Sequence, residues 1–118
     1  MAKILIIDDS SFQRSILKKI IKTTPHEFHE VSEGQSGIDY FTENHVDLIF
    51  CDLLMPGISG FDVLKKLAIV KPDTPAIVIT ADIQESVRDE CLELGAKKFL
   101  NKPVNKGQVV NAITEILG

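Results

Sequence analysis

Short apolar runs alternate with longer amphipathic segments five times along the chain, and this alternation constrains the fold more than any other feature. Three of the runs are continuously apolar and rich in Ile and Val, which is typical of parallel strands covered on both faces. A weaker run carries polar residues at alternate positions and is predicted to be an edge strand. The five predicted strands are residues 4–7, 28–31, 48–51, 76–79 and 99–100.

The segments that follow these strands have apolar residues at helical spacing. Ser10 and Gln13 are predicted to form a capping box at the start of the first helix, which ends before Pro25. Gly95 is predicted to cap the end of the fourth helix. The residues expected on the inward faces of the five helices are Phe12, Ile16, Leu17, Ile20, Ile21, Ile38, Phe41, Phe61, Leu64, Leu67, Ala68, Ile83, Val87, Cys91, Leu94, Val109, Ile113, Ile116 and Leu117.

The predicted elements thus form a strand followed by a helix, repeated five times. Right-handed crossovers between parallel strands place helices on both faces of the sheet. We therefore predict an α/β fold built on a doubly wound, five-stranded parallel sheet. The chain has 118 residues, and we find no repeat and no linker in it. Residues 1–118 are accordingly expected to form a single domain.

Composition excludes some classes of function. The net charge is −4, and 13 Lys and Arg are scattered among 17 acidic residues, which argues against contact with nucleic acid. No apolar run is long enough for a signal peptide or a membrane span, so we expect no membrane association. Cys51 and Cys91 lie in apolar segments without metal-ligand spacing. They are predicted to be reduced structural thiols of a cytoplasmic protein.

Polar residues follow four of the five predicted strands at the point where each strand ends. Asp8 and Asp9 follow the first strand, Asp52 the third, Thr80 the fourth and Lys102 the fifth. In an open α/β sheet the ligand crevice lies outside the carboxyl ends of the strands. These five side chains, from segments far apart in sequence, are therefore predicted to meet at one edge of the sheet.

Each of these residues also has a purely structural interpretation. Asp8 or Asp9 could cap the first helix, and Asp52 could begin the turn that residues 56–57 complete. Thr80 could be an ordinary β-branched strand residue, and a lysine after a strand is often a solvated loop residue. For Asp52, Thr80 and Lys102 taken one at a time, the structural interpretation is at least as good as the functional one. The joint pattern favours a functional site.

Electrostatics indicates what such a site would hold. Three carboxylates within about 4–6 Å repel one another by several kcal/mol at an effective dielectric constant of about 20. A divalent cation resolves this repulsion, and a few hard oxygen ligands suit Mg²⁺. The cation and Lys102 would allow a carboxylate to react with an anionic phosphoryl group, and the Thr80 hydroxyl could donate to it. Phosphoryl transfer requires mostly positioning and charge neutralisation, which these residues supply.

With these residues in place, the chain resembles the response-regulator receiver family, in particular its stand-alone CheY-like members. The resemblance extends over the whole chain and rests on four short segments in the order and spacing of the family. The segments are Ile6-Ile7-Asp8-Asp9-Ser10, Phe50-Cys51-Asp52-Leu53-Leu54-Met55-Pro56-Gly57, Ile79-Thr80-Ala81 and Lys102-Pro103. It implies a flavodoxin-like fold with strand order 2-1-3-4-5.

The resemblance also implies roles for the acidic residues. Asp52 would accept a phosphoryl group from a histidine kinase or a phosphotransfer protein. Mg²⁺ would be held by Asp9, Asp52 and the backbone carbonyl of Leu54. Asp8 would act on the metal mainly through bound water. The protein would be a regulator that assists its own phosphorylation and dephosphorylation rather than an enzyme with its own substrate.

The remaining site residues would read out the phosphoryl group. Thr80 and Lys102 would bind its oxygens, and Phe99 stands at the position of the family's switch aromatic. Phe99 would turn inward as Thr80 moves, altering the face made by the fourth helix, fifth strand and fifth helix, where a downstream protein effector would bind. Chemotaxis is one pathway that this analogy suggests. The family usually has a cis peptide bond at the position of Lys102-Pro103.

Some positions differ from the best-known family pattern. Phe99 lacks the hydroxyl of the usual tyrosine, which affects partner specificity rather than the switch itself. Leu54 is apolar where many relatives are polar, and Asp82 lies two residues after Thr80. Ala81 is small and would leave the phosphoryl pocket open. We expect the lifetime of the phosphorylated form to differ from that of relatives with polar flanking residues.

Other classes of protein fit less well. A phosphotransferase of the haloacid-dehalogenase type needs an acid two residues after its nucleophile, where this chain has Leu54 after Asp52 and Ser10 after Asp8. A flavodoxin-like cofactor protein needs a phosphate loop that Asp8 and Asp9 would repel. A degenerate receiver that acts as a phosphate-independent interaction module remains the main alternative. Solvated or edge positions are expected for His26, His29 and His45.

Overall fold

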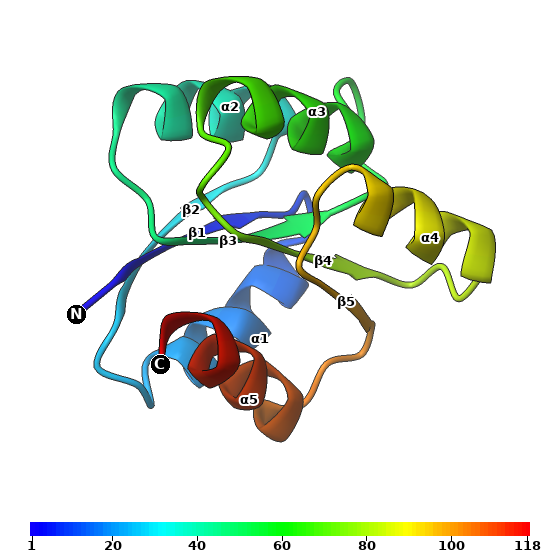
Figure 1. Cartoon of the computed structure of the whole chain (residues 1–118). Helices are drawn as coiled ribbons and strands as arrows, with labels where there is room; N and C mark the ends of the chain where they lie inside the picture. Colours follow the sequence, from blue (N-terminus) through cyan, green and yellow to red (C-terminus); the bar gives the residue numbers. More distant parts are fainter.

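The computed structural model describes residues 1–118 and has three layers, with a five-stranded parallel sheet between two layers of helices (Figure 1). The strand order is β2-β1-β3-β4-β5, which confirms both the predicted α/β class and the predicted order. The elements are β1 (Lys3–Ile7), α1 (Ser11–Ile21), β2 (Glu27–Val31), α2 (Gly34–Glu43), β3 (Leu48–Asp52), α3 (Gly60–Val70), β4 (Ala76–Thr80), α4 (Glu85–Glu93), β5 (Lys98–Asn101) and α5 (Lys106–Leu117).

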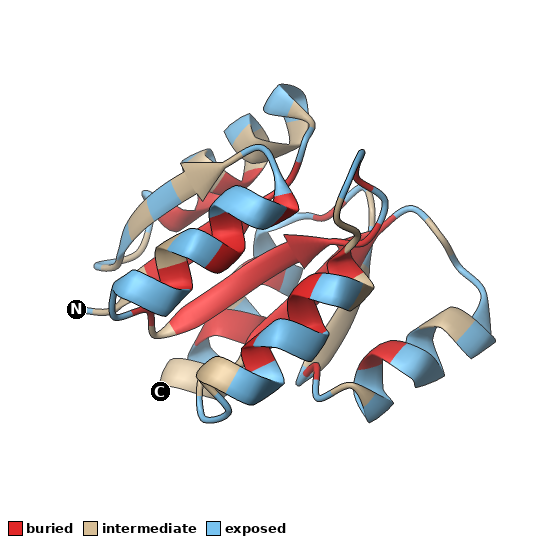
Figure 2. Cartoon of the chain, turned by 90° about the horizontal axis from the view of Figure 1, so that it is seen from above, coloured by how far each residue is buried: buried red, intermediate tan, exposed pale blue.

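Two apolar cores lie on the two faces of the sheet, because successive strand residues point to opposite sides. Leu5 and Ile7 of β1 pack under α2, α3 and α4, whereas Ile4 and Ile6 pack over α1 and α5. All residues of β3 and β4 are buried (Figure 2). β2 pairs only with β1 and is partly exposed, as predicted for an edge strand.

The ends of α1 and α4 follow the predicted chemistry in part, because Ser10 caps α1 without the return bond from the Gln13 side chain that a full capping box has. The Ser10 hydroxyl accepts a hydrogen bond from the backbone N–H of Gln13 and so caps α1. Gly95 follows α4 with a φ of +105°, a left-handed conformation that glycine adopts without steric cost. Cys51 and Cys91 are buried free thiols, as predicted.

Three residues expected on inward helix faces are exposed, so these predictions were wrong. Phe12 is 71% exposed because it lies in the first turn of α1, next to the end of the sheet. Ile83 is 82% exposed and belongs to the loop before α4. Ala68 is exposed because the face of α3 that packs against the core is made by Val63, Leu64 and Leu67.

Gly60 allows the start of α3 to approach the end of β3 closely. A Cβ atom at this position would lie 2.3 Å from the backbone oxygen of Asp52 and 2.7 Å from Cα of Leu53. We therefore expect Gly60→Ala to lower the free energy of unfolding by about 2 kcal/mol, measured by urea denaturation, because the backbone around Asp52 must shift.

Gly107→Ala in α5 is the matched control for Gly60→Ala. A Cβ atom there meets nothing closer than 3.4 Å. The control is expected to be neutral or to gain up to about 1 kcal/mol from helix propensity. Equal stability of the two variants would contradict the close approach.

Candidate functional site

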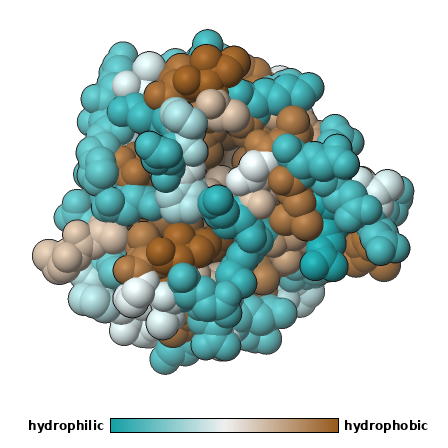
Figure 3. Space-filling view, in the orientation of Figure 1, coloured by the Kyte–Doolittle hydropathy of each residue, from teal (hydrophilic) through white to brown (hydrophobic).

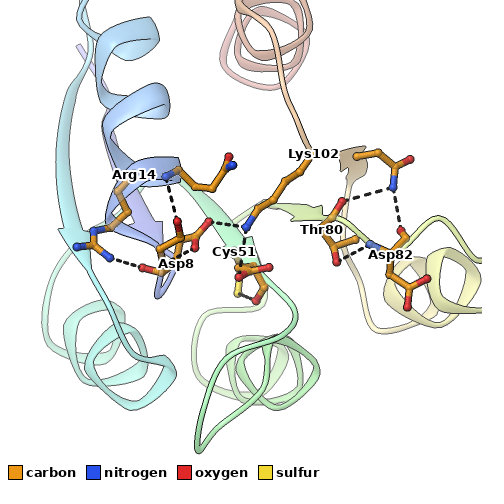
Figure 4. A network of polar contacts seen from close by, with 10 residues as sticks. Asp8, Arg14, Cys51, Thr80, Asp82 and Lys102 are labelled. Carbon is orange, nitrogen blue, oxygen red and sulfur yellow. Dashed lines mark hydrogen bonds and ion pairs between the residues drawn. The ribbon is translucent and has the colours of Figure 1, made fainter.

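The carboxyl ends of the central strands bring the predicted site residues together (Figure 4). Asp52 is the last residue of β3 and Thr80 the last residue of β4, and these strands are neighbours in the sheet. Ile7 of β1 is paired with Cys51 of β3, so Asp8 emerges beside Asp52. Lys102 follows β5 and reaches back across the edge of the sheet.

Asp8, Asp9 and Asp52 form an acidic cluster in which one oxygen of each carboxylate lies within 4.8 Å of the others. Asp8 and Asp52 are buried, with 2% and 5% exposure, whereas Asp9 is open to solvent. Asp8 does not cap α1, since Ser10 does so and Asp8 Oδ1 accepts from the backbone N–H of Ser10. The cluster has the hard oxygen donors and the excess negative charge that suit Mg²⁺.

Lys102 is drawn into this cluster and is not a solvated loop lysine. Its Nζ lies 3.1 Å from Asp8 Oδ2 and 3.4 Å from Asp52 Oδ2, and its side chain is only 14% exposed. Figure 4 shows the Lys102 side chain pointing toward the carboxylate of Asp8. The Lys102-Pro103 peptide bond is cis, as the family resemblance implied. One ammonium group therefore contacts two of the three clustered carboxylates, which leaves net negative charge in the cluster.

This excess charge acts on the protonation of Asp52. The pKa of the Asp52 carboxyl is raised from its ordinary 3.8 to about 6, because burial and then the nearby Asp8 charge raise it by more than Lys102 lowers it. An ionised Asp52 is thus held at a free-energy cost in the metal-free fold. A bound cation would remove that cost.

We expect the contribution of Asp52 to the stability of the metal-free protein to fall as the pH rises from 3.8 to about 6. Below this interval Asp52 is protonated in both folded and unfolded chains. Within this interval the Asp52 carboxyl of the unfolded chain loses its proton before that of the folded chain, so unfolding becomes easier. Above the interval the full decrease in the free energy of unfolding is reached, and it is no more than about 3 kcal/mol.

Thermal unfolding of wild type and Asp52→Asn, each across this pH range, isolates the contribution of Asp52. Asp52→Asn is expected to melt higher than wild type near neutral pH, with the difference shrinking toward pH 3.8. Added Mg²⁺ should raise the melting temperature of the wild type. A variant that melts lower than wild type at neutral pH would contradict the charge cluster.

Thr80 and the loop after β4 are fastened to the end of β5. The fully buried Thr80 hydroxyl accepts from the backbone N–H of Asp82 at 3.2 Å, leaving its own proton available to donate. Asn101 Nδ2 donates to the Asp82 carbonyl at 2.8 Å and to the Thr80 carbonyl at 3.4 Å. The backbone N–H of Lys102 also donates to the Thr80 carbonyl, at 2.8 Å. A movement of Thr80 is therefore coupled to β5.

The other predicted positions lie around this centre. Leu54 follows Asp52 by two residues, and its side chain is 66% exposed. Phe99 is half-buried on β5, three residues before Lys102. The three histidines take no part in the cluster: His26 accepts from the backbone N–H of Ala2, His29 stacks on Tyr40, and His45 pairs with Asp47.

Arg14 is a site residue that the sequence did not reveal. One of its terminal nitrogens donates to the backbone carbonyl of Asp8 at 2.6 Å, and its Nε donates to Glu30 at 2.9 Å. Lys18 pairs with the same Glu30 at 2.7 Å, and these two cations lower the Glu30 pKa. The guanidinium group thus fixes the turn that carries the acidic pair, as Figure 4 shows for Arg14 and Asp8. The sequence shows Arg14 four residues before Lys18 on the same predicted helix. It does not show that their shared partner, Glu30 of β2, lies beside them.

Fold and site together define a doubly wound α/β protein with a polyanionic centre at the carboxyl edge of its sheet. Residues 4–114 match the family described as the response regulator receiver domain. The chain therefore belongs to the response regulator receiver domain family of two-component signalling. Members of this family are signalling regulators and not classical enzymes.

Relatives with known names differ in how much of their length this chain covers. A chemotaxis protein CheY from Thermotoga maritima is 31% identical over 115 residues, covering 97% of this chain and 96% of the relative. The transcriptional regulatory protein SrrA from Staphylococcus aureus is 36% identical over 115 residues, covering 98% of this chain but only 47% of the relative. The chain thus matches both a short, CheY-like protein and a part of a longer regulator.

Solved structures show the same fold. The receiver domain of a putative LuxO repressor protein from Vibrio parahaemolyticus superposes with a TM-score of 0.94 at 27% identity, covering 98% of this chain and 89% of that one. A CheX-CheY-BeF₃-Mg²⁺ complex from Borrelia burgdorferi includes a chain with a TM-score of 0.94 at 23% identity, covering 99% and 90%.

None of the helices combines the length and the apolar character that crossing a membrane requires.

Proposed function

We propose that residues 1–118 form a single receiver domain that works as a phosphorylation-dependent switch, with Asp52 as the phosphoryl acceptor. The observation that carries this proposal is the acidic cluster of Asp8, Asp9 and Asp52 with Lys102 bridging two of its carboxylates. The donor would be a histidine kinase or a phosphotransfer protein.

The transfer itself is a single displacement at phosphorus. An oxygen of the Asp52 carboxylate forms a bond to phosphorus while the bond between phosphorus and the donor's imidazole nitrogen breaks, and its electron pair leaves with the imidazole. Lys102 would hold one phosphoryl oxygen and Thr80 would donate its hydroxyl proton to another. The protein therefore contributes positioning and charge neutralisation.

Asp8, Asp9, Asp52 and the Leu54 carbonyl are the groups that would hold Mg²⁺. When bound, the ion offsets the negative charge that otherwise keeps a phosphoryl group away from the carboxylates. The three clustered carboxylates fit this role, and Asp9 is open to solvent on the side from which an ion would enter.

The signal would leave the site through the face formed by α4, β5 and α5. The hydrogen bonds from Asn101 and Lys102 to the Thr80 carbonyl couple the loop after β4 to the strand that carries Phe99. A downstream protein would bind this face in the cytoplasm, in chemotaxis or a similar pathway. The alternative of a degenerate receiver finds no support in the site, since Asp52, Thr80 and Lys102, the proposed acceptor and phosphate-binding residues, all come from the carboxyl edge of the sheet.

Incubation with radiolabelled acetyl phosphate tests this function without a kinase. We expect a base-labile label on the protein that appears with Mg²⁺ and does not form when the metal is chelated before acetyl phosphate is added. No label at all would contradict the proposal. A label that forms equally well without Mg²⁺ would contradict the metal requirement.

A further inference from the structure

Hydrophilic side chains cover much of the face seen in Figure 3, and ion pairs exposed in this way usually contribute little to a structure. Two cations differ from the rest. Among the cations that form ion pairs, Arg14 and Lys102 have the least exposed side chains, at 16% and 14%. Both contact Asp8, Lys102 at the carboxylate and Arg14 at the backbone carbonyl. Lys102 has a role in the proposed phosphoryl transfer, whereas that transfer assigns none to Arg14.

Asp8 is held at each of its polar groups. Its backbone N–H donates to a carbonyl of β2 at 3.2 Å, and its Oδ1 accepts from the backbone N–H of Ser10 at 2.9 Å. Lys102 meets its Oδ2 at 3.1 Å, and Arg14 donates to its backbone carbonyl at 2.6 Å. Of these four contacts, only the one from Arg14 falls on the peptide group that joins Asp8 to Asp9.

This peptide group determines where Asp9 lies. It is planar and contains the Asp8 carbonyl together with the N–H and Cα of Asp9, so an anchored carbonyl oxygen fixes the direction in which the chain leaves Asp8. Asp8 is buried in the fold, but Asp9 is exposed and is not held by surrounding side chains in the same way. The placement of the Asp9 carboxylate in the acidic cluster therefore depends on the peptide plane that Arg14 anchors.

Glu30 orients the guanidinium group from the neighbouring strand β2. Arg14 Nε donates to Glu30 Oε1 at 2.9 Å, while a terminal nitrogen of the same planar group donates to the Asp8 carbonyl. Because a guanidinium presents its donors in one rigid fork, each of these bonds fixes the direction of the other. Lys18 pairs with the second oxygen of Glu30 at 2.7 Å. Lys18 is thus a cation of the same network whose ion pair is with Glu30 and not with the acidic cluster.

We propose that Arg14, oriented by Glu30, is a positioning residue that raises the affinity of the acidic cluster for Mg²⁺ by fixing the direction of Asp9. The inference rests on the proposed function, in which the clustered carboxylates hold the ion. Charge and position act in opposite directions here. A cation beside a cation site weakens Mg²⁺ binding through repulsion. An anchor of the ligands strengthens it, and groups that orient metal ligands typically change the affinity by about 10- to 100-fold.

Mg²⁺ titrations of wild type and Arg14→Met, followed by amide NMR shifts, decide between the two effects. Met keeps much of the side-chain length but removes the charge and both hydrogen bonds. We expect the dissociation constant of Mg²⁺ to rise by about tenfold. The shifts are followed on signals of the folded protein, so a loss of stability does not imitate this change. An unchanged or lower dissociation constant would overturn the proposal, because removing a cation acts through charge only to tighten Mg²⁺ binding.

Two further variants separate position from charge. Arg14→Lys keeps the charge but loses the rigid fork, so we expect weaker Mg²⁺ binding where charge by itself predicts no change. Lys18→Met is the matched control, since it takes a cation from the same Glu30 carboxylate and leaves the contact with Asp8 in place. Its affinity for Mg²⁺ should not fall below that of wild type. Wild-type affinity in Arg14→Lys, or an equal loss in Lys18→Met and Arg14→Met, would overturn the assignment.

Glu30→Gln tests whether Glu30 acts through Arg14. We expect this substitution to weaken Mg²⁺ binding on its own and to have little further effect once Arg14→Met is present, because the guanidinium that Glu30 orients is then gone. An equal loss of affinity in both backgrounds would overturn the part of the proposal that concerns Glu30.

Acetyl phosphate labelling at low and at saturating Mg²⁺ distinguishes this inference from the proposed function. Arg14→Met should be labelled more slowly than wild type at low Mg²⁺ and at nearly the wild-type rate at saturation, since the affinity for the ion is what changes. A variant that stays slow at saturation, or one that equals wild type at every Mg²⁺ concentration, contradicts this inference alone. A wild-type protein that takes no label contradicts the proposed function.

Discussion

Asp52→Asn is expected to reduce phosphoryl labelling by acetyl phosphate by on the order of 100-fold or more, to the background of the assay. An amide oxygen is a poor nucleophile and forms no stable acyl phosphate, and Asp52 is the carboxylate that both Lys102 and the other acids surround. The fold itself should persist, because Asn has nearly the same shape and relieves charge repulsion. Circular dichroism and thermal unfolding check this in the same samples.

Asp73→Asn is the matched control for this loss. Asp73 is an exposed acid in the turn before β4, at the opposite edge of the sheet. It undergoes the same chemical change without touching the cluster, so labelling should equal that of wild type. Full labelling of Asp52→Asn would place the acceptor on another residue.

Lys102→Met is expected to give the second-largest effect, and it acts on both stability and labelling. Met keeps much of the side-chain length but removes the charge that bridges Asp8 and Asp52. Leaving buried charges without a partner costs about 3 kcal/mol, so the metal-free variant should unfold at a lower urea concentration than wild type. The labelling rate should fall by on the order of 100-fold, because an electrostatic contact to the phosphoryl group is lost.

The opposite signs of two substitutions make this prediction specific. Near neutral pH and without metal, Lys102→Met should destabilise the fold, whereas Asp52→Asn should stabilise it. Combining them should recover part of the loss, since the repulsion that Lys102 relieves is then smaller. Lys106→Met, at an exposed position at the start of α5, is the control and should change neither property. A Lys102→Met variant as stable and as readily labelled as wild type would contradict the bridge.

Much of the site could be predicted because parallel strands bring their carboxyl ends to one edge. Asp52 and Thr80 close fully buried strands, and the end of such a strand is visible in the sequence as the point where an apolar run stops. The paired acids after the first strand follow the same rule. What this rule cannot give is which atoms touch, and the double contact of Lys102 with Asp8 and Asp52 appears only in the structure.

Other features depend on relations between elements that no local pattern carries. Arg14 meets the Asp8 carbonyl and Glu30 because β2 pairs with β1 in one particular register, which apolar spacing does not specify. Phe12 and Ile83 fit helical periodicity, but Phe12 lies in the first turn of α1 and Ile83 in the loop before α4, and both side chains are exposed.

The site of phosphorylation can be read directly from the covalent structure of the labelled protein. Borohydride reduces an aspartyl phosphate to a residue of lower mass, and peptide mass spectrometry locates that residue in wild-type protein treated with acetyl phosphate and Mg²⁺. We expect the reduced residue at position 52, in the peptide that includes Cys51 and Leu53, and we expect no reduced residue when Mg²⁺ is left out. Reduction at Asp8, Asp9 or any other carboxylate, with residue 52 unchanged, would contradict it.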